Sequence, residues 1–166
     1  EYLMLSAFAV TPNNEFIVPD AMGGKINFYN DDYSFRNEIS GFFPSPPVGI
    51  MPVDGGFVGL KPAWEQNEDE MLTGMGVYLW EDSTEALVTY RENLIPFDMN
   101  DMGAMAKTTV IFTVDSSENV YLAEYDTENY LVTACAPDGQ EIWTIQEDFP
   151  MVMKSQEDIE IERDIV

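Results

Sequence analysis

Short apolar runs that end at Gly, Pro, Asn or Asp recur along this chain, and their recurrence limits its possible folds more than any other feature. Two segments, residues 8–42 and 112–149, align without a gap from their first residues. The matched residues are Phe8 with Phe112, Val10 with Val114, Ile17 with Tyr121, and Val18 with Leu122. Helical periodicity is scarce, whereas short apolar runs between turn-forming residues are typical of β-strands. The sequence therefore predicts a repeat built from many short strands.

A looser copy lies between these two, at residues 49–93, and carries the insertion KPAWEQNEDEMLTGMG at residues 61–76. Each copy reads strand, tight polar turn, strand, variable loop, strand, tight turn, strand. Four antiparallel strands in about 40 residues is the size of a propeller blade. We therefore predict an all-β fold, a β-propeller-like repeat of four-stranded antiparallel blades. Residues 1–150 hold about three blades, which we place at residues 8–43, 48–93 and 110–149.

Residues 151–166 form an acidic tail after the last blade. Ser155 stands three residues before Asp158, which resembles the start of a capping box and predicts a short helix in this tail. The alternation of Ile159 and Ile161 with acidic residues leaves a strand as the alternative.

Three blades are too few to close a ring, which has a direct consequence for the two end blades. Each would leave one apolar face exposed, and large exposed apolar faces mark interaction or aggregation sites. We expect the arrangement to be completed by another segment of a larger protein or, as a second choice, by further copies of this chain. The remaining alternative is that the segments are not blades.

The chain carries 31 acidic and 7 basic residues, a net charge of −24. Such a surface repels phosphates and anionic lipids, so we expect no nucleic acid partner and no binding to acidic membranes. Solubility explains the charge without any partner, while attraction of cations or of a basic protein is the functional alternative. No apolar run approaches the roughly 18–20 residues that a membrane span needs.

The chain has no histidine, and this absence removes several chemistries. Ser-His-Asp and Cys-His catalysis and the usual zinc ligand sets all need histidine. The single cysteine, Cys135, stands between two alanines without a basic neighbour to activate it, so we interpret it as a small packing residue on a strand. The following Pro137, Asp138 and Gly139 predict a tight turn, because proline fixes φ and glycine tolerates positive φ.

Two segments supply the candidate binding residues. The insertion combines a tryptophan with acidic residues and could form a ligand lip, although a solvated loop with its tryptophan packed onto the blade is the alternative. The connection at residues 93–109 is rich in methionine, which suits an adaptable contact surface or the filling of irregular gaps. The candidates are Trp64, Glu65, Glu68 and Asp69 in the insertion, and Met99 and Met102 in the connection.

Metal and cofactor signals are weak in this sequence. The stretch DMNDMG at residues 98–103 partly follows a calcium loop, but Met102 stands at its fifth position and Thr109 at its twelfth, where a carboxylate is wanted. We predict no cofactor and keep calcium at an acidic cluster as an alternative. Paired carboxylates could perform glycosidase chemistry, yet the 31 candidates cannot be narrowed to catalytic residues.

The unit FTVDSSENVYLAEYDTENYLVTACAPDGQEIWTI, from residue 112, resembles the blades of bacterial six-bladed β-propellers related to NHL-repeat proteins. Those blades read hydrophobic-x-V-D-x-x-G-N-hydrophobic-Y-hydrophobic-A-D, a strand, D-x-x-G, and a last strand. The following FPMVMKSQEDIEIERD is similar to an acidic Lys-Ser-x-x-(Glu/Asp)-Ile stretch that often interrupts such propellers. The chain departs from the family pattern where the first turn of two units lacks glycine and where the middle unit carries its insertion. The resemblance implies a periplasmic or extracellular protein.

The leading functional hypothesis is a non-catalytic binding or assembly scaffold that docks a protein partner through a blade face or the insertion. The alternative is a propeller-type hydrolase or lyase that uses carboxylates or a metal in a central channel. A ligand sensor is a third possibility. A scaffold predicts a stable complex, whereas an enzyme predicts carboxylates from several inner strands that converge on one point.

Overall fold

The computed structural model describes residues 8–67, 70–124 and 129–148 of the chain. This part contains twelve strands and one short 3₁₀ helix, η1. The strands form three four-stranded antiparallel sheets, and in each sheet the spatial order of the strands follows the chain. The prediction of an all-β, propeller-like repeat of four-stranded blades is confirmed, and the three sheets do not close a ring within the described residues.

Sheet 1 is the first four-stranded unit, and its strands are β1 (Ala9–Val10), β2 (Phe16–Asp20), β3 (Lys25–Tyr29) and β4 (Phe35–Ser40). The turn between β1 and β2 is closed by the Asn14 amide, which donates to the Thr11 carbonyl at 3.0 Å. Asn14 takes a positive φ of 61°, which asparagine tolerates better than most residues. The expected first turn is therefore confirmed.

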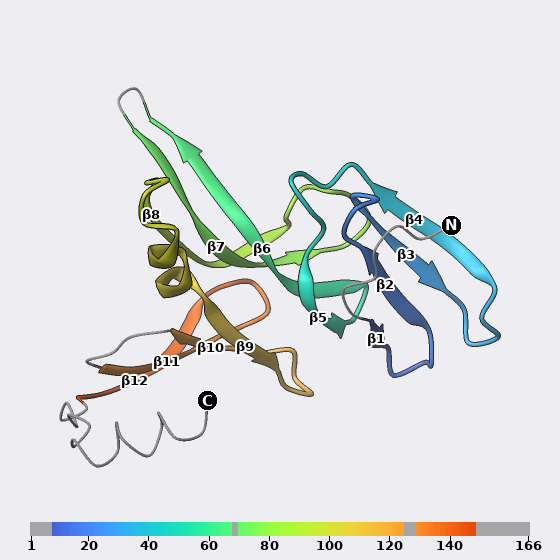
Figure 1. The fold of residues 1–166 in the computed structure, drawn as a ribbon. Coiled ribbons are helices and arrows are strands. Elements are labelled where there is room, and N and C mark those ends of the chain that lie inside the picture. The colour runs from blue at the N-terminus through green and yellow to red at the C-terminus, as the bar shows by residue number, and fades with distance from the viewer. Residues whose placement is uncertain (1–7, 68–69, 125–128, 149–166) are drawn as a thin grey trace, which may run out of the picture.

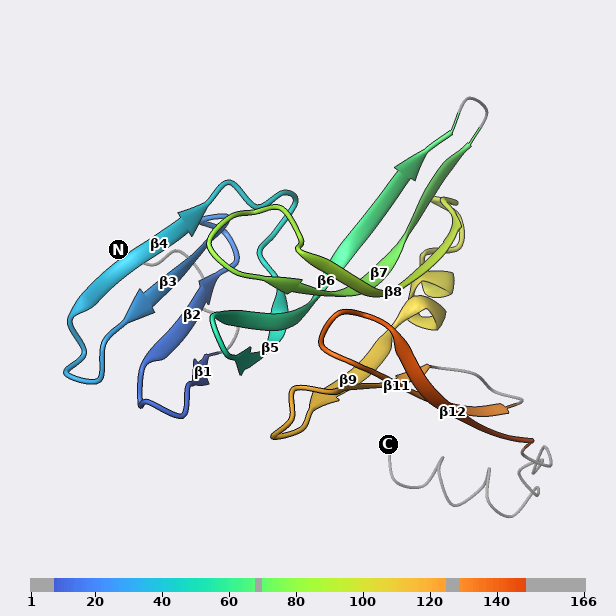
Figure 2. The ribbon, with the colours of Figure 1, turned by 180° about the vertical axis from the view of Figure 1, so that it is seen from behind.

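Sheet 2 is larger, and its strands are β5 (Val48–Val53), β6 (Gly56–Gln66), β7 (Met71–Trp80) and β8 (Val88–Pro96). Strands β6 and β7 pair continuously from Phe57 with Trp80 to Gln66 with Met71. The described part of the insertion, residues 61–67 and 70–76, which we expected to be a loop, is therefore the outer part of a long β-hairpin, and that expectation was wrong. Figures 1 and 2 show this hairpin projecting beyond the rest of the molecule.

Helix η1 (Met102–Thr108) connects sheet 2 to sheet 3 and contacts β7 and β8. Its first turn is capped by the Asp101 carboxylate, which accepts a hydrogen bond from the Ala104 amide at 3.1 Å. The connection expected at residues 93–109 is shorter than predicted, because β8 continues to Pro96 and η1 occupies most of the rest.

Sheet 3 consists of β9 (Val110–Val114), β10 (Val120–Glu124), β11 (Asn129–Cys135) and β12 (Glu141–Asp148). Its first turn repeats that of sheet 1, since the Glu118 amide donates to the Asp115 carbonyl at 3.0 Å and Glu118 has a φ of 64°. The predicted turn before β12 is confirmed by a hydrogen bond from the Gly139 amide to the Ala136 carbonyl.

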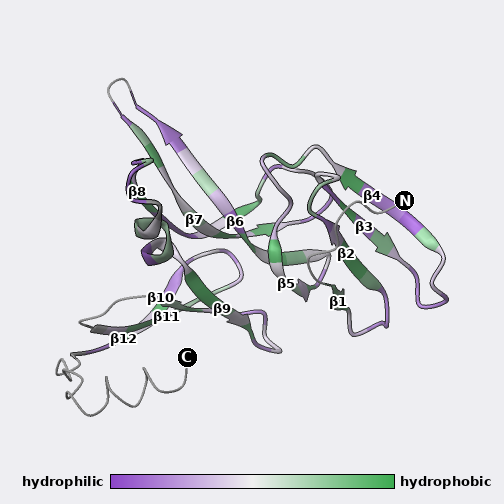
Figure 3. Cartoon of the chain, viewed as in Figure 1, coloured by the Kyte–Doolittle hydropathy of each residue, from purple (hydrophilic) through white to green (hydrophobic). Residues whose placement is uncertain are grey.

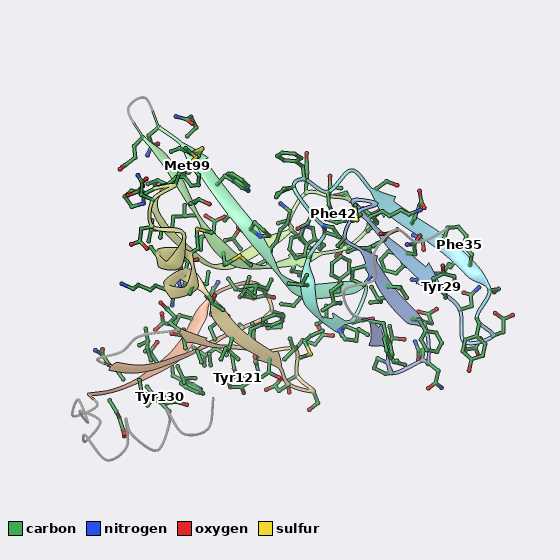
Figure 4. The ribbon with its side chains drawn as sticks, viewed as in Figure 1. Tyr29, Phe35, Phe42, Met99, Tyr121 and Tyr130 are labelled. Atoms are coloured by element: carbon green, nitrogen blue, oxygen red, sulfur yellow. The ribbon has the colours of Figure 1, made fainter. Side chains whose placement is uncertain are left out.

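Sheet 2 packs on sheet 1 through an aromatic core. Trp80, which is 1% exposed, stacks on Phe57 at a centroid distance of 5.6 Å and meets the edge of Phe42 at 6.2 Å. Figure 4 places Phe42 where the connection after sheet 1 reaches sheet 2. Rings in such stacked and edge-to-face contacts contribute beyond their buried area. This core fixes the first two sheets against each other.

Sheet 2 packs on sheet 3 through a second, mainly aliphatic core. Val58 and Val77 of sheet 2 are fully buried there, together with Val120 and Leu122 of sheet 3. Cys135 belongs to this core and is 3% exposed. Burial raises the pKa of its thiol, so the interpretation of Cys135 as a packing residue is confirmed.

Candidate functional site

The face of sheet 1 that points away from sheet 2 is apolar and open. A shallow hollow of about 340 Å³ on this face is lined by Phe16, Val18, Tyr29 and Tyr33. Phe8, Val10 and Phe35 on the same sheet are 67%, 44% and 55% exposed. Figure 4 shows Tyr29 and Phe35 on the side of sheet 1 away from sheet 2. We call these seven residues the open face of sheet 1.

The opposite end of the molecule presents a similar surface on sheet 3. Strand pairing places Trp143 beside Ala134 and Ile145 beside Val132, on the side away from sheet 2. The Tyr121 ring contacts the Trp143 ring at 5.9 Å, and Figure 4 shows Tyr121 and Tyr130 on that same side. We call this surface the open face of sheet 3, and it consists of Ile111, Tyr121, Tyr130, Trp143 and Ile145.

Residues at matched positions of the repeat lie on an open face in one sheet and in a buried core in the other. Val18 on the open face of sheet 1 matches Leu122, which is 1% exposed in the core between sheets 2 and 3. Ile17 is 2% exposed between sheets 1 and 2, and it matches Tyr121 on the open face of sheet 3. Each open face therefore uses the same strand positions that other sheets bury against a neighbour.

A cavity of about 260 Å³ lies at the base of the long hairpin. The Tyr78 ring in its wall lies over Gly76, and its hydroxyl donates to the Glu92 carboxylate at 2.7 Å. Burial and the Glu92 carboxylate together raise the pKa of Tyr78. Trp64 and Lys61 of β6 also line this cavity.

Lys61 differs from the other partly buried cations of the chain. Within the described ranges it has no carboxylate partner, although the chain is strongly acidic. Burial lowers the pKa of its ammonium group. The described cations that do form ion pairs are Lys25 with Glu38, Arg36 with Glu15, and Arg91 with Glu124. Lys61 therefore offers an unused positive charge beside the cavity.

A wider cleft of about 590 Å³ lies where turns of the three sheets meet. Six carboxylates line it, Glu15, Asp54, Glu81, Asp82, Asp115 and Glu118, with Arg36 as its single basic residue. Glu15 pairs with Arg36 at 2.7 Å, and Glu118 accepts a hydrogen bond from the Asp54 amide. The first contact ties the turn before β2 to β4, and the second ties two turns together, so both carboxylates have structural roles.

Asp115 in the same cleft also has a structural role, because hydrogen bonds from the protein occupy its carboxylate. Its carboxylate accepts hydrogen bonds from the Ser117 and Asn119 amides, the Asn119 side chain and the Tyr121 hydroxyl. Hydrogen bonds from the Asn119 side chain and the Tyr121 hydroxyl lower the pKa of Asp115. Asp115 therefore organises the first turn of sheet 3, which leaves little of its carboxylate for a ligand.

Metal and membrane signals are absent from the described part of the chain. No cluster of three or more acidic or cysteine side chains there is arranged to hold a metal ion. Among the same residues, no helix has the length and apolar character of a membrane span.

The structure separates the candidate residues of the sequence. Trp64 and Glu65 lie on β6, and Trp64 is 51% exposed at the cavity. Glu68 and Asp69 lie outside the described residues. Met99 follows β8 and is 76% exposed, while Met102 begins η1, and its side chain lies outside the described part.

Sequence reasoning missed Lys61 and Tyr78 at the cavity and the aromatic residues of the two open faces. Alternation along each strand could have grouped the open-face residues, but it cannot say which face a neighbour covers. No family model and no curated protein matches this chain.

Proposed function

We propose that this protein is a non-catalytic assembly scaffold that docks a protein partner on the open faces of sheets 1 and 3. The observation that carries the proposal is the equivalence between Val18 and the fully buried Leu122. Side chains at such positions gain about 25 cal/mol for each Å² of apolar surface removed from water. A partner that supplies another apolar sheet would repeat the packing already made within the chain.

Two sources of that sheet are compatible with the proposal: a further segment of a larger protein, or a second copy of this chain. The dependence of association on salt concentration distinguishes association between copies from binding to a basic protein. Two chains of net charge −24 repel each other, so salt strengthens association between copies. Binding to a basic partner weakens as salt rises.

The arrangement of carboxylates in the acidic cleft favours a scaffold over a hydrolase or lyase. Enzymatic acid–base chemistry needs carboxylates that face a shared ligand position. Glu15, Asp115 and Glu118 instead hold turns together through an ion pair and hydrogen bonds. These three carboxylates lie at turns, whereas the enzyme hypothesis predicts that carboxylates on several inner strands converge on one point.

The resemblance to NHL-related six-bladed propellers and a periplasmic or extracellular location belong to the same proposal. The blade-like sheets support the first, since each has four antiparallel strands in chain order. The high negative charge is compatible with the second.

Sedimentation of the purified 18.8 kDa chain over a wide concentration range, alone and with added partner, tests the proposal. We expect particles heavier than the monomer, and we expect Val10→Asp and Ile111→Asp to weaken their formation. Leu87→Asp is the matched control, because Leu87 is 60% exposed in a loop outside both open faces. A soluble monomer whose open faces bind no hydrophobic dye would contradict the proposal.

A further inference from the structure

Beyond Leu60, strand β6 has a free edge. Strand β5 pairs with β6 only from Val53 with Gly56 to Val48 with Leu60. Strand β7 continues along the other side of β6 to Gln66. Residues 61–66 of β6 therefore have a strand neighbour on one side and, within the described residues, none on the other.

The sequence before β5 explains why this edge stays free. Continuing the β5–β6 ladder would place Pro47 beside Lys61 and Pro46 beside Pro62. Proline has no backbone N–H and cannot donate to a ladder. Pro46 and Pro47 are instead buried, and Pro47 packs against Gly59. The preceding chain therefore leaves the sheet at this point.

The direction of the backbone groups on β6 follows from the turn that begins it. Val53 and Gly56 flank the two-residue turn, so the Gly56 backbone groups point toward β5. Because these directions alternate along an antiparallel strand, the even-numbered residues all point to that side. Pro62 agrees with this assignment. If the backbone of Pro62 faced β7, the β6–β7 ladder would lack one hydrogen bond, because proline has no N–H. The free edge thus offers the N–H and C=O of Trp64 and Gln66.

The cavity at the hairpin base reaches the stretch of β6 that has the free edge. Four consecutive residues, 61–64, line it, although successive side chains of a strand point to opposite faces. Tyr78 and Trp80 of β7 and Glu92 of β8 line it as well, so it also extends over the face of the sheet that carries Lys61. Thr84 and Ala86 of the loop before β8 also line it.

From this geometry we infer that the free edge of β6 accepts an extended segment of a protein partner as an additional antiparallel or parallel strand. Main-chain hydrogen bonds to Trp64 and Gln66 hold the segment. The mode of recognition is strand addition, in which pockets for alternate side chains supply the specificity. This site is separate from the two open faces, and it does not depend on the proposed assembly.

The two faces of β6 set the chemistry of the partner segment. One face carries Lys61 and Glu65, and Lys61 is a partly buried cation that forms no ion pair with a described carboxylate, although Glu92 lines the same cavity. The other face carries Leu60, Pro62 and Trp64. The segment therefore presents a carboxylate on the Lys61 side and apolar side chains on the Trp64 side. Opposite charges across neighbouring strands stabilise their pairing.

The probe is a synthetic peptide of sequence V-T-I-E-I-T-V, with blocked ends, added to the ¹⁵N-labelled full chain. Its length fits the free stretch, which spans roughly 20 Å at about 3.3 Å per residue. We expect the peptide to shift the amide signals of Trp64 and Gln66 and to slow their hydrogen exchange. No change at these two amides at the highest soluble peptide concentration overturns the inference, as do shifts confined to the open faces.

Two variants separate the backbone from the side chain. Trp64→Pro removes the outward N–H and abolishes binding, whereas Trp64→Ala keeps the N–H and retains part of it. Ile142→Ala, at an exposed position of β12 outside both open faces, is the control and leaves binding unchanged. Should Trp64→Pro fail to fold, two N-methylated peptides replace it. Methylation of the amides that face β6 abolishes binding, and methylation of the alternate amides does not; equal effects of the two overturn the inference.

The role of Lys61 is measured by a double-mutant cycle. Lys61→Gln weakens binding of the glutamate peptide about threefold, within the range for cross-strand charge pairs. The same substitution leaves binding of a peptide with glutamine in place of glutamate unchanged. An equal loss for both peptides would refute the assigned carboxylate contact.

Discussion

Leu122 and Val18 offer the sharpest test of the packing, because the repeat places them at matched positions in different environments. Leu122 is 1% exposed between sheets 2 and 3 and belongs to the aliphatic core. Val18 is partly exposed on the open face of sheet 1. Truncation to alanine should therefore have unequal effects at the two positions.

The magnitudes follow from burial. Leu122→Ala removes a fully buried side chain and leaves a cavity, which lowers the free energy of unfolding by about 3 kcal/mol. Val18→Ala removes two carbons, worth roughly 1.6 kcal/mol if fully buried and about 0.8 kcal/mol at partial burial. The expected difference between the two variants is about 2 kcal/mol, well above the error of a careful unfolding experiment.

Urea unfolding, followed by circular dichroism at low protein concentration, measures both variants against the parent chain. Equal m-values are required, so that the midpoint shifts report stability alone. Equal losses of stability would refute the packing of sheet 3 on sheet 2. A Val18→Ala loss that grows with protein concentration would instead show that a second copy covers the open face of sheet 1.

Three further changes test other parts of the structure. Gly76→Ala should lower the free energy of unfolding by about 2 kcal/mol, because a Cβ would collide with the Tyr78 ring and hydroxyl. Gly103→Ala should be close to neutral in the same unfolding assay, because a Cβ there would meet only the Asp101 carboxylate, at an ordinary contact distance of 3.5 Å. Burial raises the pKa of Tyr90 to about 12, and burial together with the Glu92 carboxylate raises that of Tyr78 further. The contribution of each to stability is complete below about pH 10 and is lost as pH rises through the raised pKa, first for Tyr90 and then for Tyr78. Absorbance at 295 nm should show these two tyrosines ionising late, and ordinary midpoints for all tyrosines would contradict their burial. Hydrogen bonds lower the pKa of Asp115, so its contribution to the free energy of unfolding is present above about pH 4 and disappears as pH falls through the lowered pKa. Asp115→Asn should therefore reduce the loss of stability at acidic pH. An unchanged loss would argue against the hydrogen bonds of this turn.

The repeat was predictable because its turns are specified locally. Asn14 and Glu118 stand 104 residues apart, both adopt a positive φ, and both close the first turn of a sheet with the same hydrogen bond. Pro137, Asp138 and Gly139 likewise specify their own turn. Turn chemistry depends on a few neighbouring residues, so a single sequence is sufficient to reveal it.

The long hairpin was not predictable for the opposite reason. Its strands contain residues with poor strand propensity, including Pro62, Gly74 and Gly76. Gly74 is needed because a Cβ there would collide with the Asn93 carbonyl of β8, and Gly76 makes room for the Tyr78 ring. Contacts between strands therefore outweigh local preference, and these contacts are invisible in a linear sequence.

The candidate site was predictable only in part. Trp64 was a candidate because it stands beside acidic residues in an insertion, and it is 51% exposed at a cavity, although on a strand. Lys61 escaped notice because a lone lysine in a sequence shows neither its burial nor its lack of a partner. In a chain with 31 acidic residues, a partly buried lysine that pairs with none of the described carboxylates becomes informative only when the positions of those carboxylates are known.

The edges and the faces of the three sheets are protected differently, and the difference bears on how long each contact would last. The outermost strands carry charged residues, such as Arg36 and Glu38 on β4 and Glu141 on β12, and Figure 3 shows the hydrophilic character of β4. Charges and prolines on strand edges prevent uncontrolled pairing. The open faces lack such protection, since their members are aromatic and aliphatic. An open apolar face of this kind requires a permanently bound partner. The β6 edge is less prone to uncontrolled pairing, because Pro62 lacks a backbone N–H, and it therefore suits a partner segment that binds transiently.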